Sequence, residues 1–179
     1  MKILSLLISL FVFTSFSPVA SPEKPSFEEI EWISFEEAIE RNKKEPKKIF
    51  IDVYTDWCGW CKRMDQTTFK NEVISKLLSK HYYAVKLDAE QKEAIEFDGN
   101  TFKFVANGRR GYHELAAALL QNKLSFPTVV FLDEQMRMIQ PIPGYQQPQS
   151  LAPILQYIGE DHFKKTPWED FQKTYKSQF

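Results

Sequence analysis

Residues 57–62 read Trp-Cys-Gly-Trp-Cys-Lys, and they follow closely on the apolar run Ile-Phe-Ile-Asp-Val-Tyr of residues 49–54. Cys58 and Cys61 are the only cysteines of the chain. A strand that leads a C-x-x-C pair to the start of a helix is typical of a dithiol/disulfide redox centre. The stretch therefore predicts thiol chemistry at the point where a strand meets a helix.

The spacing of the two cysteines suits a pair that opens and closes. Residues i and i+3 of a helix lie on one face with Cβ atoms roughly 5–6 Å apart, and a disulfide needs about 3.5–4.5 Å. Cys58 would lie where free backbone N–H groups and the helix dipole favour an anion, which predicts a pKa below that of an ordinary thiol. Cys58 is therefore the expected attacking thiolate, and the more buried Cys61 is the expected resolving thiol.

Two other interpretations of the pair remain open from the sequence. A structural staple that closes a four-residue loop would contribute only about 1.9 kcal/mol, against about 3 kcal/mol for fifteen residues. A metal site usually needs four ligands, and the three histidines, His81, His113 and His162, are remote from the pair in sequence. Redox exchange is the leading hypothesis, and it requires no metal and no organic cofactor.

The first 20 residues have the pattern of a secretory signal peptide. Lys2 precedes an apolar run at 3–13, and small residues with a proline follow to Ser21. The apolar run is short for a membrane span of about 20 residues, although an uncleaved anchor is the alternative. We expect cleavage near Ala20, a periplasmic or secreted location, and no membrane span after signal removal. Disulfides persist in such compartments.

Composition narrows the function classes further. The chain is 43% apolar and 15% aromatic, which is typical of a folded domain rather than a disordered chain. Lys and Arg number 23 and Asp and Glu 24, a formal net charge of −1. This balance gives no support to nucleic-acid binding. We expect one monomeric domain.

Periodicity and capping signals predict an α/β order along the chain. A helix is expected at 34–41, with Ser34 as N-cap and Glu37 completing a capping box. Further helices are expected from Cys58 to about residue 64, within 68–81, at 112–121, at 148–158 with Pro153 in the first turn, and from Thr166 as N-cap. Strands are expected at 48–54, 82–87, 128–132 and 136–142, with a hairpin of 95–97 and 101–105 around Asp98-Gly99 and a loop at 107–111.

Residues 50–62, Phe-Ile-Asp-Val-Tyr-Thr-Asp-Trp-Cys-Gly-Trp-Cys-Lys, resemble the active-site segment of the thioredoxin family. Phe126-Pro127-Thr128 resembles its cis-proline loop, and Gly144 resembles the glycine near its substrate groove. The resemblance implies a thioredoxin-like α/β fold, a central mixed sheet flanked by helices, here with an inserted hairpin. The domain divisions expected are a signal peptide at 1–20, linker and helix at 21–46, the thioredoxin-like domain at 47–160 with an insertion at about 91–111, and a helical tail at 161–179.

The resemblance also implies roles for individual residues. Asp52 would be the buried acid that moves protons to and from Cys61, with Lys86 as its ionic neighbour, and its apolar flanks predict a raised pKa. Pro127 would be cis and would place the Phe126 backbone beside Cys58 for an extended substrate segment. The other expected substrate-binding residues are Trp57, which also packs beside the thiols, Gly59, Trp60 as an exposed contact, and Gly144.

The sequence departs from the thioredoxin pattern at three places. Trp60 replaces the usual proline before the second cysteine, and residues 64–69 resemble secreted bacterial thioredoxin-like proteins with a broken second helix. The segment between Lys86 and Pro127 is roughly 20 residues longer than in a minimal thioredoxin. This insertion, which includes Arg109-Arg110, is either an accessory element that selects partners or an edge hairpin without a function of its own. His113 within it is expected to have a structural role.

Two main functional hypotheses follow. The first is an exported thiol–disulfide oxidoreductase that acts on protein thiols and disulfides and is reset by a redox partner; Gly59 resembles reducing members and favours reduction. The second is a thioredoxin-like binding or folding module, in which Trp60 and the hairpin are the working surface and the dithiol is secondary. A third, a metal-delivery protein that binds copper or zinc through the reduced pair, is disfavoured by the small number of histidines.

Overall fold

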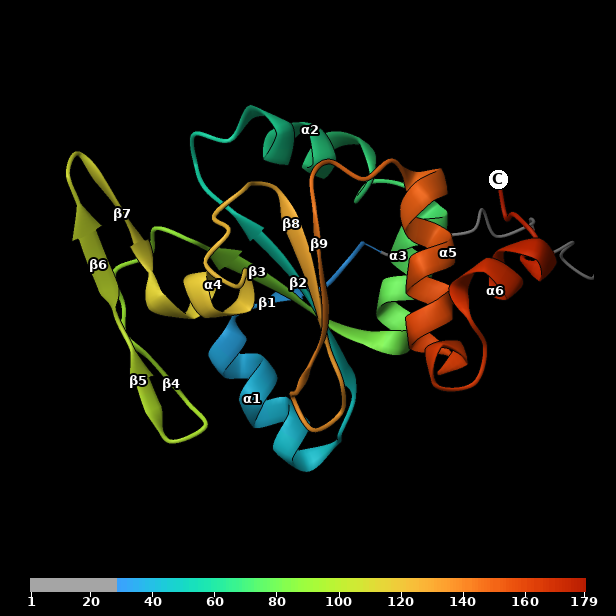
Figure 1. The fold of residues 1–179 in the computed structure, drawn as a ribbon, viewed down its shortest axis with the longest axis horizontal. Coiled ribbons are helices and arrows are strands. Elements are labelled where there is room, and N and C mark those ends of the chain that lie inside the picture. The colour runs from blue at the N-terminus through green and yellow to red at the C-terminus, as the bar shows by residue number, and fades with distance from the viewer. Residues whose placement is uncertain (1–28) are drawn as a thin grey trace, which may run out of the picture.

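A computed structural model describes residues 29–179, so the predicted signal peptide at 1–20 and the start of the predicted linker lie outside the described residues. Within the described part, five strands form a central sheet in the order β1-β3-β2-β8-β9 (Figure 1). Strands β1, β2 and β3 are parallel, whereas β8 and β9 run antiparallel to their neighbours. The predicted mixed sheet is confirmed. Its strands are β1 (Trp32–Ile33), β2 (Lys48–Tyr54), β3 (Tyr82–Asp88), β8 (Thr128–Leu132) and β9 (Met138–Pro143).

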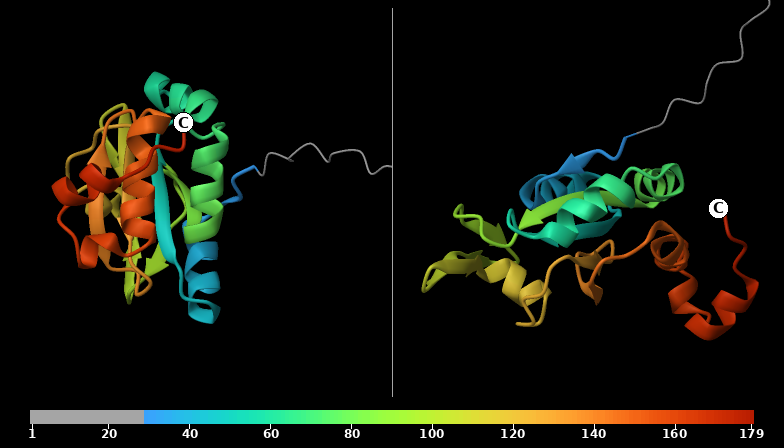
Figure 2. Two further views of the ribbon diagram at one scale, coloured as in Figure 1. Left: turned by 90° about the vertical axis from the view of Figure 1, so that its right-hand side faces the viewer. Right: turned by 90° about the horizontal axis from the view of Figure 1, so that it is seen from above.

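Helices cover both faces of this sheet (Figures 1 and 2). One face packs against α1 (Phe35–Lys44) and α4 (Glu114–Leu119), and the other packs against α2 (Gly59–Thr67), α3 (Glu72–His81) and α5 (Pro148–Gly159). The central strand β2 is buried along nearly its whole length, as its continuous apolar run predicts. Because strand side chains alternate, Ile51 and Val53 join the first core, while Phe50 joins the second. Asp52 therefore faces the same side of the sheet as α2.

The predicted helix-capping and first-turn signals of α1 and α5 are confirmed only in part. Ser34 caps α1, and its Oγ accepts a hydrogen bond from the Glu37 N–H at 3.1 Å. The Glu37 carboxylate instead accepts from Arg41, so the predicted return half of the capping box is wrong. Pro148 occupies the first turn of α5, which places Pro153 inside the helix rather than in that turn.

The C-terminal helix and the second helix also differ in detail from expectation. The last helix, α6 (Trp168–Thr174), begins after Pro167, so Thr166 is not its N-cap. Helix α2 extends to Thr67, beyond the expected end near residue 64. A break separates α2 from α3, which Asn71 caps. This break agrees with the resemblance of residues 64–69 to proteins with an interrupted second helix.

The insertion contains two hairpins, where the sequence predicted one hairpin and a loop. β4 (Ile95–Phe97) and β5 (Asn100–Phe102) meet at the expected Asp98-Gly99 turn, with φ of 49° and 71°. β6 (Phe104–Asn107) and β7 (Arg110–His113) form the second hairpin around Gly108, whose φ is 62°. The expected loop at 107–111 and the helix start at residue 112 are therefore wrong. Each hairpin is a separate two-stranded sheet, and both project from one side of the domain (Figure 1).

His113 anchors the base of the second hairpin. Its side chain is fully buried, and its Nδ1 accepts from the Leu115 N–H at 3.3 Å, which caps α4. Its Nε2 lies 3.0 Å from the Glu93 carbonyl oxygen, and its backbone N–H donates to Ala89 at 2.6 Å. These contacts are those of a structural histidine, as expected.

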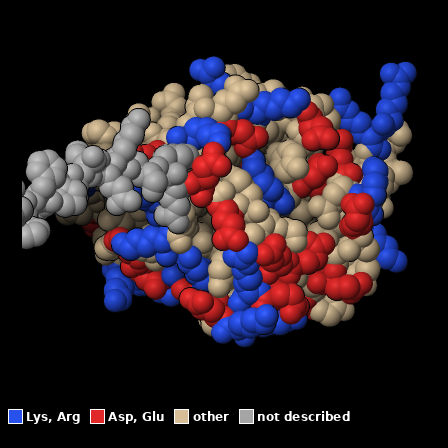
Figure 3. Space-filling model, turned by 180° about the vertical axis from the view of Figure 1, so that it is seen from behind, with Lys and Arg blue, Asp and Glu red and all other residues tan. Residues whose placement is uncertain are grey.

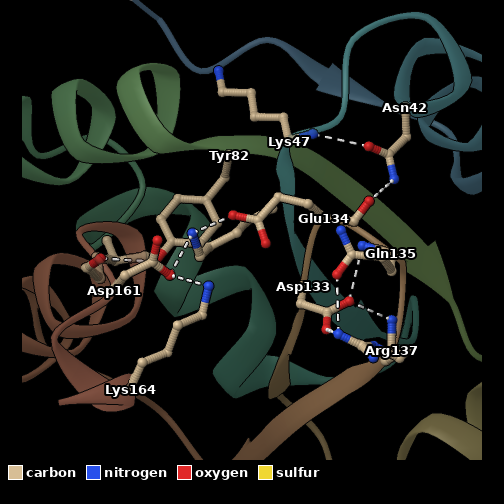
Figure 4. A network of polar contacts seen from close by, with 11 residues as sticks. Asn42, Lys47, Tyr82, Asp133, Glu134, Gln135, Arg137, Asp161 and Lys164 are labelled. Carbon is tan, nitrogen blue, oxygen red and sulfur yellow. Dashed lines mark hydrogen bonds and ion pairs between the residues drawn. The ribbon is translucent and has the colours of Figure 1, made fainter.

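Ion pairs around the buried Lys48 hold the C-terminal segment to the sheet (Figure 4). The Lys48 ammonium, almost inaccessible at the start of β2, lies 2.5 Å from Glu134 and 2.9 Å from Asp161. Burial lowers the pKa of Lys48, but the two carboxylates more than offset this effect and raise it overall. Asp161 precedes the short helix η1 (His162–Lys164). The network therefore joins this segment to the turn between β8 and β9.

The surface seen in Figure 3 carries basic and acidic side chains that are interspersed, without a region of one sign across that face. This distribution agrees with the near-zero net charge. No helix within residues 29–179 is both long enough and apolar enough to cross a membrane.

Candidate functional site

Cys58 and Cys61 form a disulfide at the N-terminus of α2, directly after β2. Cys58 is the N-cap residue, and its backbone N–H donates to the Thr55 carbonyl oxygen at 3.0 Å. Its Sγ accepts a hydrogen bond from the Cys61 N–H, also at 3.0 Å. Both residues are buried, with 5% and 2% of their surface exposed. The predicted pairing at a strand–helix junction is present.

The surroundings of Cys58 favour a negative charge on its sulfur once the disulfide is reduced. An N-cap position faces the unpaired N–H groups and the positive end of the helix dipole. The Cys61 N–H already points at this sulfur, and the first turn of α2 contains no acidic residue. A position of this kind favours the thiolate form of a cysteine.

Asp52 is the buried acid that the sequence predicted. Only 1% of its surface is exposed, and its Oδ2 accepts from the Lys86 ammonium at 2.6 Å. Its Oδ1 is buried and has no hydrogen-bond partner among the described residues. Burial raises the pKa of Asp52 to about 6, although the positive charge of Lys86 opposes this shift. A carboxyl group with this pKa exchanges protons near neutral pH.

Asp65 is a residue of this site that the sequence did not reveal. Lys86 is bound by the Asp65 carboxylate as well as by Asp52. Its ammonium also lies 4.8 Å from the ring centre of Trp32 and 5.1 Å from that of Phe69. Burial lowers the pKa of Lys86, but the two carboxylates raise it overall, so the ammonium stays charged. Asp65 stands one turn after Cys61, and nothing local in the sequence signals its partner.

The loop before β8 has the predicted cis peptide bond between Phe126 and Pro127. The Pro127 carbonyl oxygen accepts from the Gly144 N–H at 2.8 Å, which joins two segments of the expected substrate groove. Gly144 has a φ of 90°, a conformation that side chains rarely adopt. The rings of Trp57 and Phe126 meet edge to face, with centres 6.0 Å apart. The structure therefore brings the residue before Cys58 against the cis-proline loop.

Both tryptophans beside the disulfide are exposed. Trp60 has 64% of its surface exposed, as predicted, and lies against Tyr145 with ring centres 5.5 Å apart. Trp57 packs on Phe126, and 50% of its surface is exposed. Tyr145 was missed by the sequence analysis, although its position next to Gly144 was a usable signal.

The surface around Gly59 is open, and the described residues offer no cluster of metal ligands. Gly59 begins α2 and would have open space around an added Cβ atom. Together with Trp60 and Arg63, it lines a shallow hollow in the surface. Residues 29–179 contain no group of three or more histidine, cysteine, aspartate or glutamate side chains arranged to hold a metal ion.

The fold and the site define a class: a thioredoxin-fold protein with a C-x-x-C dithiol/disulfide centre, the kind of centre that thiol–disulfide oxidoreductases use. More narrowly, the family model described as "Thioredoxin-like domain" matches residues 35–159, and the chain belongs to that family.

Comparison with known proteins gives several relatives. Disulfide bond reductase DsbH of Chlamydia pneumoniae is 27% identical over 112 residues, which are 62% of this chain and 60% of that protein. Spermatogenesis-associated protein 20 of Homo sapiens is 33% identical over 72 residues, 40% of this chain and 9% of the human protein. The chain thus spans less than two thirds of DsbH and a small part of the human protein.

Solved structures show the same fold. A thioredoxin-fold protein from Helicobacter pylori matches with a TM-score of 0.56 and 20% identity, covering 84% of this chain and 89% of that one. DsbH oxidoreductase matches with a TM-score of 0.54 and 19% identity, covering 81% and 95%. At these identities the likeness establishes the thioredoxin fold alone.

Proposed function

We propose that this protein is an exported thiol–disulfide oxidoreductase that exchanges disulfides with protein substrates through Cys58 and Cys61. The observation that supports it most directly is the disulfide at the N-terminus of α2, on the side of the sheet that buries Asp52. A structural staple has no need of a buried carboxylate with a raised pKa, whereas proton transfer to a thiol does.

The reaction proceeds in two exchanges. In the reduced protein, the Cys58 thiolate attacks one sulfur of a substrate disulfide, and the other substrate sulfur leaves as a thiolate. Cys61 then attacks the Cys58 sulfur while Asp52 accepts its proton, so the second substrate sulfur also leaves as a thiolate. The substrate gains two electrons from the pair, which becomes the disulfide. Its two thiolates take up one proton from Asp52 and one from solvent. A separate redox partner restores the dithiol.

Trapping of the first intermediate tests this sequence of steps. Cys61→Ser leaves Cys58 able to attack but removes the thiol that resolves the mixed disulfide. We expect the pre-reduced variant to accumulate a covalent 1:1 adduct with a disulfide peptide, seen by mass spectrometry and reversed by dithiothreitol. The Cys58→Ser variant is the matched control, and equal adduct formation in both variants would contradict the assigned order.

We further propose that the physiological direction is reduction of substrate disulfides. Gly59 resembles reducing family members, and the relative from Chlamydia pneumoniae is called a disulfide bond reductase. Titration of the Cys58–Cys61 pair against a redox buffer is expected to give a potential nearer to about −270 mV than to about −120 mV. A potential near the second value would assign the protein to substrate oxidation.

Export is part of the same proposal. Its support is the Lys2 and apolar 3–13 pattern of the N-terminus. N-terminal sequencing of the protein from its native cells should begin near residue 21, and a chain that retains residues 1–20 in the cytosol would exclude export.

The second candidate function is a binding or folding module. The observation in its favour is the pair of exposed tryptophans, Trp57 and Trp60. The two functions differ in their need for sulfur: a binding module retains its partners when Cys58 and Cys61 are both serine, whereas covalent exchange does not.

A further inference from the structure

The second hairpin of the insertion reaches the redox site through Arg110. The guanidinium carbon of Arg110, the first residue of β7, lies 4.0 Å from the centre of the Trp57 ring. Trp57 is bonded to Cys58 and also contacts Phe126 of the cis-proline loop. The insertion is therefore continuous with the surface around the disulfide, although no strand of it joins the central sheet.

Contacts at the base and in the middle of the β6–β7 hairpin fix the position of Arg110. The base is fixed by the contacts of His113 with Ala89 and Glu93. The Phe104 ring lies so close to Gly111 that an added Cβ atom would be 2.1 Å from it, so only glycine fits beside Arg110. The guanidinium is thus presented by a packed hairpin rather than by a loose loop.

The charge of Arg110 is available for a ligand. Its side chain is exposed, and within residues 29–179 no ion pair joins it to a carboxylate, not even to Asp56, which precedes Trp57. A second exposed arginine, Arg63, lines the shallow surface hollow together with Trp60 and makes no ion pair in the described chain. Its guanidinium is not seated on the Trp60 ring, so the contact between Arg110 and Trp57 is the one that carries the argument.

We propose that the β6–β7 hairpin is part of the substrate-binding surface, and that Arg110 on Trp57 selects disulfide substrates with an acidic side chain next to the reacting cysteine. A guanidinium that contacts an aromatic ring through its carbon can still use its N–H groups to bind a carboxylate through two hydrogen bonds. An extended segment at the cis-proline loop would carry its neighbouring side chains past this edge. The proposal rests on the proposed thiol–disulfide exchange.

The test uses two disulfide peptides that differ only in having Glu or Lys at the positions flanking the cysteine. The second-order rate constant of the pre-reduced protein is measured with each peptide at low ionic strength, where exposed charges are least screened. We expect the Glu peptide to react about tenfold faster than the Lys peptide. Arg110→Gln should reduce this ratio to about twofold, and Arg110→Glu should invert it.

Arg109→Gln is the matched control, because it removes the same charge from the adjacent position without touching the Trp57 contact. It should retain the wild-type ratio within about twofold. Thermal unfolding of all three variants checks that the hairpin changes leave the domain folded.

Two results would overturn the inference while leaving the proposed function intact. One is equal rates for both peptides with the wild-type protein. The other is an equal loss of the ratio in Arg109→Gln and Arg110→Gln, which would show a general charge effect. Absence of Cys58-dependent exchange with either peptide would instead reject the proposed function, and the inference with it.

Discussion

Replacement of Cys58 by serine is expected to lower the rate of disulfide exchange about 1000-fold or more. Serine keeps the shape of the N-cap side chain but has no thiolate to attack a disulfide at neutral pH. The thiol that remains, Cys61, lies within α2 rather than at its N-cap and is 2% exposed, so we do not expect it to replace Cys58 in the attack. Reduction of insulin disulfides, followed by turbidity, measures the effect.

The same variant separates redox exchange from a structural staple. A staple over four residues contributes about 1.9 kcal/mol, so its loss would appear as a lower free energy of unfolding. Cys58→Ser and Cys61→Ser both remove the disulfide and serve as controls for each other in stability. Retention of wild-type exchange by Cys58→Ser, with only a change in stability, would favour the staple.

Asp52→Asn is expected to make the protein more stable at pH 7.5, by about 3 kcal/mol. Burial raises the pKa of Asp52 to about 6 from an ordinary value of 3.8. The folded protein therefore binds a proton more tightly than the unfolded chain, and stability falls as pH rises from about 4 to about 6. Asparagine cannot ionise and escapes this loss, so the gain should vanish at pH 4. Urea unfolding at both pH values measures it.

The gain in stability should be accompanied by a loss of activity. Without the carboxylate to accept the Cys61 proton, the resolving step should slow about tenfold or more near pH 7, and its dependence on pH around 6 should disappear. Asp65→Asn is the control, since it removes a carboxylate from the same Lys86 ammonium at a partly exposed position. Equal effects of Asp52→Asn and Asp65→Asn on exchange would contradict a proton-transfer role for Asp52.

The site was predictable wherever the signal was local. Residues 49–54 and the cysteines that follow define a strand–helix junction within a few bonds of chain, so the position of Cys58 as N-cap required no knowledge of the rest of the fold. The turn at Asp98-Gly99 was equally local, because only those two residues needed positive φ. The burial of Asp52 followed from its apolar neighbours on a covered strand.

Local signals failed where the sequence of a segment was compatible with two different structures. The segment at 107–113 was interpreted as a loop leading to a helix, and it forms a hairpin because Phe104 and His113 pair across it. The helix therefore begins only at Glu114. The residue before it, His113, contacts the backbone carbonyl oxygens of Glu93 and Ala89. These partners lie about 20 residues away, beyond the reach of propensity.

The sequence was sufficient for the redox pair, its helix and the class of chemistry, because these depend on residues that are bonded neighbours. The cis-proline loop was predicted from its resemblance to the thioredoxin family. The contacts of Asp65 with Lys86, Tyr145 with Trp60 and Arg110 with Trp57 came only from the folded structure. Each of these pairs is separated by 20 residues or more, and its geometry depends on how the sheet, the helices and the insertion pack together.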